Sequence, residues 1–458
     1  MPTDASSSPP QQPDVARGLW AVTWPLLLSY ALSLSLNFVD ALFLSRVSDQ
    51  AAAGGGAVLP VLGATFVAFS SISLAGCSVA SQLMGARRHR ELPVTYGSLL
   101  VFNLGAGVLV SLVFLLLHRQ LPVWLGLEGE TAEHAATYLG VLGSFQFLRA
   151  VQLGFASILN SRAETRWVLA EALLTNVANV GLNLVFLNGA FGLPPLGVAG
   201  IALATVVSLA IGLAFTVTIV RFKLKIAVAL PSRSQLREPL KRILRIGIPS
   251  ALEPVSYQCA QMVINLLIIG LGTSVLAARV YVFNCYLVTT MLWSLGFGIG
   301  TQILVAHRIG AGDFVGAQAQ LLRGLYCAIA GNLGLALLLA VIHPQLMRAF
   351  TSDPAVLAAA APLFFVAVLV EIGRAINIVC GGALRSSGDA RYTSVVGGLM
   401  MWTVGVPACF LFGHYLGYGL TGVWLGMALD ELSRGYVNYR RWQTGDWQRF
   451  AVAAPAAS

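Results

Sequence analysis

The sequence predicts an all-α membrane protein that crosses the bilayer many times. Of its 458 residues, 57% are hydrophobic and only 10% are charged, whereas soluble domains carry about 25% charged residues. The hydrophobic residues form continuous runs of about 20 residues or more, which is the length an α-helix needs to cross a bilayer, and they do not alternate as in a β-barrel. The composition therefore excludes a soluble globular protein and a disordered chain.

Twelve hydrophobic runs follow a polar stretch at the start of the chain, and each is an expected transmembrane helix. The first run is too long for the core of a signal peptide, so we expect it to be retained as the first span. The expected spans are 19–44, 52–82, 96–117, 134–159, 166–187, 197–220, 243–271, 276–306, 320–342, 356–384, 391–413 and 420–438.

Most of the 28 Lys and Arg residues lie in alternate loops, on the same side as the N-terminus. The positive-inside rule then predicts that both termini are cytoplasmic and that the protein is a multi-pass protein of the cell inner membrane. The net charge of +9 is explained by this arrangement. We therefore predict the lipid bilayer as a partner and no nucleic acid.

The chain repeats itself with a displacement of 225 residues. At this displacement His118 matches His343, and Arg149 matches Arg374. Each repeat holds six spans, an even number, so the two repeats are predicted to be parallel and to face each other across a central cavity. The expected parts are a disordered cytoplasmic tail (1–18), an N-lobe (19–222), a basic cytoplasmic linker (223–244), a C-lobe (245–440) and a cytoplasmic tail (441–458).

Motifs of enzymes and primary pumps are missing from the sequence. The chain has no Gly-Lys-Ser/Thr phosphate-binding element, no HExxH motif and no nucleophile elbow. We therefore predict a protein that is not an enzyme, with no cofactor and no metal site. A monomer that moves a small organic molecule is the expected working unit.

Asp40 in the first span is the strongest candidate for function. A charged side chain at the centre of a membrane helix costs about 2.5 to 3.5 kcal/mol on the insertion scale, so it needs a polar cavity, a partner or a function. Pro25 lies fifteen residues earlier, ~22 Å along the helix, and gives the helix a place to bend. Asp40 would take up and release protons; the structural alternative is a carboxylate satisfied by Asn37, one turn away.

Three asparagines of the fifth span, Asn176, Asn179 and Asn183, are spaced three and four residues apart and share one helix face. Together with Asp40 they could line a hydrated pocket in the N-lobe. Hydrogen bonding between helices is the equally weighted alternative.

The C-lobe carries a second group of charges within its spans. Glu371 and Arg374 are three residues apart and can form an ion pair, and Glu253 is either a titratable carboxylate or another partner of Arg374. A structural salt bridge and a coupling-ion site are both open for this group. For the acids nearer the cytoplasmic ends of spans we expect simple interfacial solvation: Glu171, Asp430 and Glu431.

Aromatic side chains within the spans are candidates for the substrate cavity, because an aromatic ring can stack on a flat cation. Packing in the core or against lipid is the alternative for each of them. Arg149 joins this candidate set as the repeat equivalent of Arg374. The aromatic candidates are Phe38, Tyr257, Tyr281 and Phe283.

The order of several short motifs resembles the multidrug and toxic compound extrusion (MATE) transporters. The motifs are Trp24-Pro25 with Asn37-Phe38-Val39-Asp40, Gln82-Leu83-Met84-Gly85-Ala86, Leu196-Gly197-Val198-Ala199-Gly200, Gly310-Ala311-Gly312-Asp313 and Leu384-Arg385-Ser386-Ser387-Gly388-Asp389. The resemblance implies export of organic, often cationic compounds in exchange for protons or Na⁺, by rocking of two lobes. It also implies roles for Asp40 and Pro25, with Asn179, Asn183 and Thr205 as polar partners.

The C-lobe departs from the pattern of NorM-like members of that family. Those members carry a glutamate and an aspartate where this chain has Tyr257 and Arg374, and its acids, Glu253 and Glu371, lie about one turn away. Coupling through Asp40 is therefore favoured, with the proton preferred to Na⁺. One alternative on the same fold is a flippase or exporter of an endogenous lipid-linked or secondary metabolite. An uncoupled channel or receptor is the alternative of another class.

Overall fold

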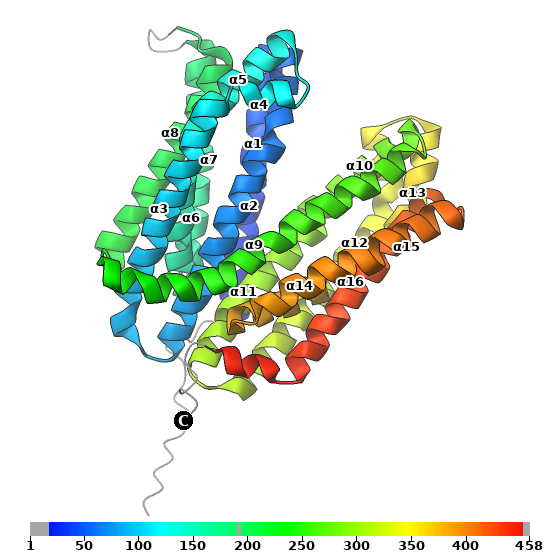
Figure 1. The fold of residues 1–458 in the computed structure, drawn as a ribbon. Coiled ribbons are helices and arrows are strands. Elements are labelled where there is room, and N and C mark those ends of the chain that lie inside the picture. Colours follow the sequence, from blue (N-terminus) through cyan, green and yellow to red (C-terminus); the bar gives the residue numbers. More distant parts are fainter. Residues whose placement is uncertain (1–17, 190–193, 452–458) are drawn as a thin grey trace, which may run out of the picture. The chain divides into compact units, whose positions relative to one another are not determined.

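The computed structural model describes residues 18–189 and 194–451, and these are almost entirely helical, with no strand among them (Figure 1). The predicted tail 1–18 lies outside the described residues except for Gly18. The principal helices are α1 (Leu19–Val47), α2 (Asp49–Gly85), α3 (Leu92–Leu117), α4 (Gln120–Trp124), α5 (Gly129–Ser144), α6 (Gln146–Ser161), α7 (Thr165–Asn188), α8 (Gly197–Thr218), α9 (Arg233–Ile269), α10 (Thr273–Tyr286), α11 (Leu292–Gly310), α12 (Phe314–Phe350), α13 (Pro354–Ser387), α14 (Ala390–Met400), α15 (Val406–Phe410) and α16 (Gly419–Gln443).

Each of the twelve predicted spans overlaps one of these helices or a helix pair. Among the described residues, ten helices are long and apolar enough to cross a membrane, and α5 with α6 forms an eleventh candidate that bends by 46°. The span predicted at 420–438 corresponds to α16, which is not among them and carries Asp430, Glu431 and Arg434 near its middle. An all-α polytopic membrane protein is thus the correct fold class.

Two predicted connecting segments contain more helix than expected. The second half of the predicted linker 223–244 is the beginning of α9, which starts at Arg233 and runs for 37 residues without a break. Within the predicted tail 441–458, α16 continues to Gln443, and the rings of Trp442 and Trp447 stack with their centroids 4.1 Å apart. Both tryptophans are buried, so the described part of this tail packs on the helices.

The chain divides into two compact units. The unit that we call the N-terminal unit contains 24–77 and 92–251, and the C-terminal unit contains the residues up to Thr23, 78–91 and the residues from Leu252 onward. The predicted lobe boundaries at 222 and 245 stay a prediction.

In the N-terminal unit, α7 packs against α8 and α3 packs against α6, while α8 also contacts α5 and α6 (Figure 1). Its hydrophobic core includes Phe114, Tyr138, Leu139 and Ile201. In the C-terminal unit, α13 packs against α11, α12 and α16. Four helices therefore surround a small set of polar side chains in each unit.

A shared hydrogen-bond pattern accompanies the sequence repeat. In the N-terminal unit, Asn103 Nδ2 donates to Ser73 Oγ over 2.8 Å and to a carbonyl of α6 over 2.9 Å. In the C-terminal unit, Asn332 Nδ2 donates to Ser294 Oγ over 2.7 Å and to a carbonyl of α13 over 2.9 Å. The two repeats thus use the same buried asparagine to join three helices.

Candidate coupling site around Asp40

The carboxylate of Asp40 on α1 is buried and receives four hydrogen bonds within the N-terminal unit. Thr205 Oγ1 donates to Oδ2 over 2.6 Å, and the Tyr138 hydroxyl donates to the same oxygen over 3.2 Å. The Nδ2 atoms of Asn179 and Asn183 donate to Oδ1 over 3.2 and 3.3 Å. Since the Asp40 side chain is only 3% exposed, these donors replace water around it.

The donors of Asp40 are also bonded to one another. Asn179 Nδ2 lies 3.0 Å from Thr205 Oγ1, and Asn183 Nδ2 donates to Asn179 Oδ1 over 3.0 Å. These side chains are buried, so the network is shielded from solvent. An ionised carboxylate accepts hydrogen bonds only, and donors fixed in this way favour that form.

The helix faces explain which predicted residues meet at Asp40. Asn179 and Asn183 lie one turn apart on α7 and both reach it, whereas Asn176 is engaged elsewhere: its Oδ1 accepts from Ser35 Oγ over 3.0 Å. Asn37 is exposed and is not among the four donors of Asp40, so the structure does not support the predicted Asp40–Asn37 pairing.

Tyr138 on α5 is the site residue that the sequence reasoning missed. It lies in an apolar stretch, and its ring belongs to the hydrophobic core of the unit. The available signal was chemical: a tyrosine buried in a membrane protein needs a partner for its hydroxyl. Here Asp40 is that partner.

Pro25 lies inside α1, which runs without interruption from Leu19 to Val47. A proline removes one backbone hydrogen bond from a helix and weakens it locally. The division of the chain into two units falls between Thr23 and Trp24, next to this proline. The weakest turn of α1 therefore coincides with the point where its residues change from one unit to the other.

Arg149 and Glu171 are further charges of the N-terminal unit. The Arg149 guanidinium lies over the Phe66 ring, 5.7 Å from its centroid. Glu171 is 7% exposed and accepts a hydrogen bond from Thr175 Oγ1 over 2.7 Å and another from Gln152. The expected interfacial solvation of Glu171 is therefore wrong, because neighbouring helices supply its partners.

The charges of the C-terminal unit form ion pairs. Arg374 Nη1 lies 2.5 Å from Glu371 Oε1, as their spacing on α13 allows. Glu253 pairs with Arg385 over 3.1 Å, so its partner is a residue that the sequence reasoning did not consider.

Asp430 and Glu431 on α16 join this buried network, and both are only 6% exposed. Arg434, one turn further along α16, contacts Asp430 Oδ2 over 2.6 Å and Glu431 Oε1 over 3.3 Å. The expected interfacial solvation of these two acids is also wrong, because their partners lie within the same helix and on α13.

The predicted aromatic candidates do not gather at one place. Phe38 is 72% exposed. Tyr281 stacks on Phe350 with ring centroids 5.3 Å apart, while Phe283 is partly buried. Tyr257 lines a pocket of the C-terminal unit. Over residues 18–189 and 194–451, no cluster of three or more His, Cys, Asp or Glu side chains is suited to hold a metal ion.

Thr205 provides a test of the network, because it makes the shortest hydrogen bond to Asp40. We expect Thr205→Val to lower the free energy of unfolding by about 1.5 to 3 kcal/mol, the usual contribution of a hydrogen bond to a charged group. Thr205→Ser keeps the hydroxyl and is the matched control. Unfolding of the purified variants in detergent measures the difference, and equal stability of the valine and serine variants would contradict the assigned bond.

The fold and the polar site together define a helical membrane transporter built from two repeats. The sequence model of the MatE family matches residues 25–185 and 249–411. This match covers more than half of the chain, which therefore belongs to the MatE family, the family that its motifs resemble.

Relatives of this chain carry transporter names. It is 31% identical over 446 residues to the uncharacterized transporter YisQ of Bacillus subtilis, covering 96% of this chain and 97% of YisQ. It is 24% identical to the probable multidrug resistance protein NorM of Thermotoga maritima, covering 96% and 95%. A solved MOP superfamily transporter from Pyrococcus furiosus, described as having a binding pocket of reverse polarity, superposes with a TM-score of 0.85 at 19% identity, covering 96% of both chains.

Proposed function

We propose that this protein is a secondary antiporter that exports organic, cationic or amphiphilic compounds in exchange for protons. The observation that carries the proposal is the Asp40 carboxylate, enclosed by four donors from three other helices. Relatives named as multidrug resistance proteins support the choice of substrate class. The chain would work in the inner membrane as a monomer with both termini in the cytoplasm, and it would need no cofactor.

Protonation of Asp40 is the proposed coupling step. The ionised carboxylate holds Thr205, Asn179 and Asn183 by hydrogen bonds that it accepts. A proton on one oxygen removes the negative charge and turns that oxygen into a donor, so the four bonds cannot all persist. The helices that carry the donors then repack around α1.

Pro25 is the proposed hinge of this movement. Repacking at Asp40 applies a load to α1, and the helix yields where a backbone hydrogen bond is missing. Bending there would shrink the polar pocket of the N-lobe and release substrate outward. Loss of the proton toward the cytoplasm restores the four hydrogen bonds and resets the cycle.

The donor set favours a proton over Na⁺ as the coupling ion. Two amide nitrogens and two hydroxyl groups direct hydrogen atoms toward the carboxylate. A sodium ion needs several oxygen atoms directed toward it, so these side chains would have to turn before it could bind. A proton requires no such ligand shell.

Arg149 favours a second candidate, an exporter of an endogenous anionic metabolite such as a lipid-linked compound. Its guanidinium lies against Phe66 and interacts electrostatically with Asp40 and Glu171. The relative whose pocket has reverse polarity gives this candidate a structural precedent. Under this alternative, anions rather than organic cations would drive proton movement.

Substrate-dependent proton movement in proteoliposomes tests the proposal. We expect ethidium, added outside vesicles with an acidic lumen, to produce a saturable rise in lumenal pH that a trapped pH-sensitive dye reports. Empty vesicles are the control. No proton movement on addition of ethidium would refute organic-cation antiport, and a proton leak without substrate would indicate a channel.

A further inference from the structure

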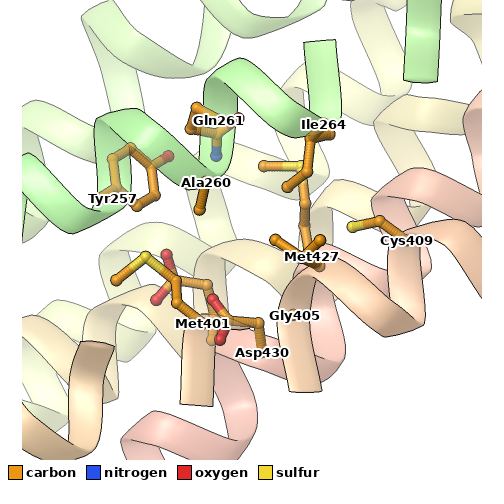
Figure 2. Close-up of a pocket in the computed structure, with 11 residues that line it drawn as sticks. Tyr257, Ala260, Gln261, Ile264, Met401, Gly405, Cys409, Met427 and Asp430 are labelled. Carbon is orange, nitrogen blue, oxygen red and sulfur yellow. The ribbon is translucent and has the colours of Figure 1, made fainter. Parts of the chain in front are cut away.

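The C-terminal unit contains a pocket beside its buried charges. It encloses about 310 Å³ between α9, the α14–α15 segment and α16. Figure 2 shows Tyr257 and Gln261 on one wall, with Met401, Gly405 and Asp430 across from them. Met401 and Gly405 begin and end η5 (Met401–Gly405), a π-helical turn. Turns of this kind are often found at functional sites.

The charges next to this pocket do not balance. Three buried carboxylates, those of Glu371, Asp430 and Glu431, share two guanidinium groups, those of Arg374 and Arg434. The nearby Glu253–Arg385 ion pair adds no net charge. The cluster therefore carries one negative charge more than its partners neutralise, and an uncompensated buried charge costs several kcal/mol.

Asp430 is the acid of this cluster with a free oxygen at the pocket. Its Oδ2 accepts from Arg434 over 2.6 Å, whereas its buried Oδ1 has no hydrogen-bond partner in the described chain. Both oxygens of Glu431 are engaged: Oε1 contacts the two arginines, and Oε2 accepts from Asn377 over 3.0 Å. The unneutralised charge is thus most available at Asp430, which lines the pocket.

The remaining walls of the pocket suit a soft, weakly hydrated cation. They consist largely of aliphatic and sulfur-containing side chains together with the Tyr257 ring: Ala260, Ile264, Met401, Val406, Cys409 and Met427. Methionine packs adaptably against varied ligands, and aromatic faces attract quaternary ammonium groups. A small alkali ion would lack the several oxygen ligands that it requires, because Gln261 Oε1 already accepts from Arg279 over 3.1 Å.

We propose that this pocket binds a small organic monocation, such as a quaternary ammonium group, with its charge against Asp430. The groups that interact electrostatically with Asp430 are Arg434 and Glu431, so Arg279 behind the opposite wall does not oppose the cation there. A volume of about 310 Å³ is at the lower end for small-molecule sites. As a subsite for exported compounds the pocket rests on the proposed function, but its occupancy can be measured without transport.

Binding of tetramethylammonium to the purified full-length protein in detergent tests the proposal. At constant ionic strength, with Na⁺ as the replaced ion, we expect a saturable rise in the unfolding temperature of the wild type. Asp430→Asn balances the cluster and should weaken the apparent affinity at least tenfold, without lowering the unfolding temperature in the absence of the ligand. Asp353→Asn removes one exposed acid and keeps a helix-capping side chain, so its affinity should equal that of the wild type.

A second pair of variants keeps the test decisive if Asp430→Asn does not fold. Tyr257→Phe retains the ring and should bind tetramethylammonium like the wild type, whereas Tyr257→Leu should bind it more weakly. Absence of a saturable effect in the wild type, or equal affinity of all variants, would overturn the proposal, as would an equal response to Na⁺.

Asp40→Asn separates this proposal from the proposed function. It should bind tetramethylammonium normally, because Asp40 belongs to the other unit of the chain. Loss of proton-coupled transport in Asp40→Asn with unchanged binding in Asp430→Asn would refute the pocket alone. Loss of binding in Asp430→Asn with normal coupled transport in Asp40→Asn would refute the proposed function alone.

Discussion

Asp40→Asn is expected to abolish proton-coupled efflux while the protein still folds. The substitution preserves the shape of the side chain but removes its ability to gain and lose a proton near neutral pH. An amide at this position also presents one oxygen and one NH₂ group to four donors, so the hydrogen bonds to one side of the group are lost. Transport should fall by about tenfold or more, the loss expected when an essential proton acceptor is removed.

Ethidium-driven proton movement in proteoliposomes and the growth of expressing cells on ethidium both measure this effect. Asp49→Asn is the matched control, because Asp49 is an exposed acid in the first turn of α2 and an asparagine is tolerated there. The control should transport at the wild-type rate. Coupled efflux by Asp40→Asn at that same rate would remove Asp40 from the mechanism.

The sequence predicts the fold and much of the Asp40 site for two different reasons. Span positions follow from runs of hydrophobic residues, which depend only on local composition. The grouping of Asp40 with Asn179, Asn183 and Thr205 follows from the family resemblance, because no local pattern links α1 to α7 and α8. Tyr138 escaped both arguments, since its hydroxyl reaches Asp40 only through the packing of α5 against α8.

The C-terminal unit marks where sequence reasoning was too local. Asp430 and Glu431 were assigned to an interface because each was considered as an isolated acid near the end of a hydrophobic run. Their separation from Arg434, four and three residues, already indicates pairs on one helix face. The contact of Glu431 with Arg374 on α13 depends on tertiary packing, so the charge imbalance becomes visible only in the structure.

A reciprocal glycine contact in the C-terminal unit carries the second large effect. A Cβ atom added to Gly310 on α11 would lie 2.0 Å from the carbonyl oxygen of Gln82, and one added to Gly85 would lie 1.9 Å from that of His307. At the displacement of 225 residues, Gln82 matches His307 and Gly85 matches Gly310. The ends of α2 and α11 therefore meet through equivalent positions of the two repeats, with backbone against backbone.

Gly310→Ala must push these two helix ends apart, because backbone atoms cannot rotate away as a side chain does. We expect the free energy of unfolding to fall by about 3 kcal/mol, at the upper end of the usual cost of overpacking. Gly105→Ala on α3 is the matched control, since its added methyl group meets no atom within 4 Å and alanine favours the helix by about 1 kcal/mol. Thermal unfolding in detergent compares the two variants, and equal stability would mean that α2 and α11 do not make this close contact.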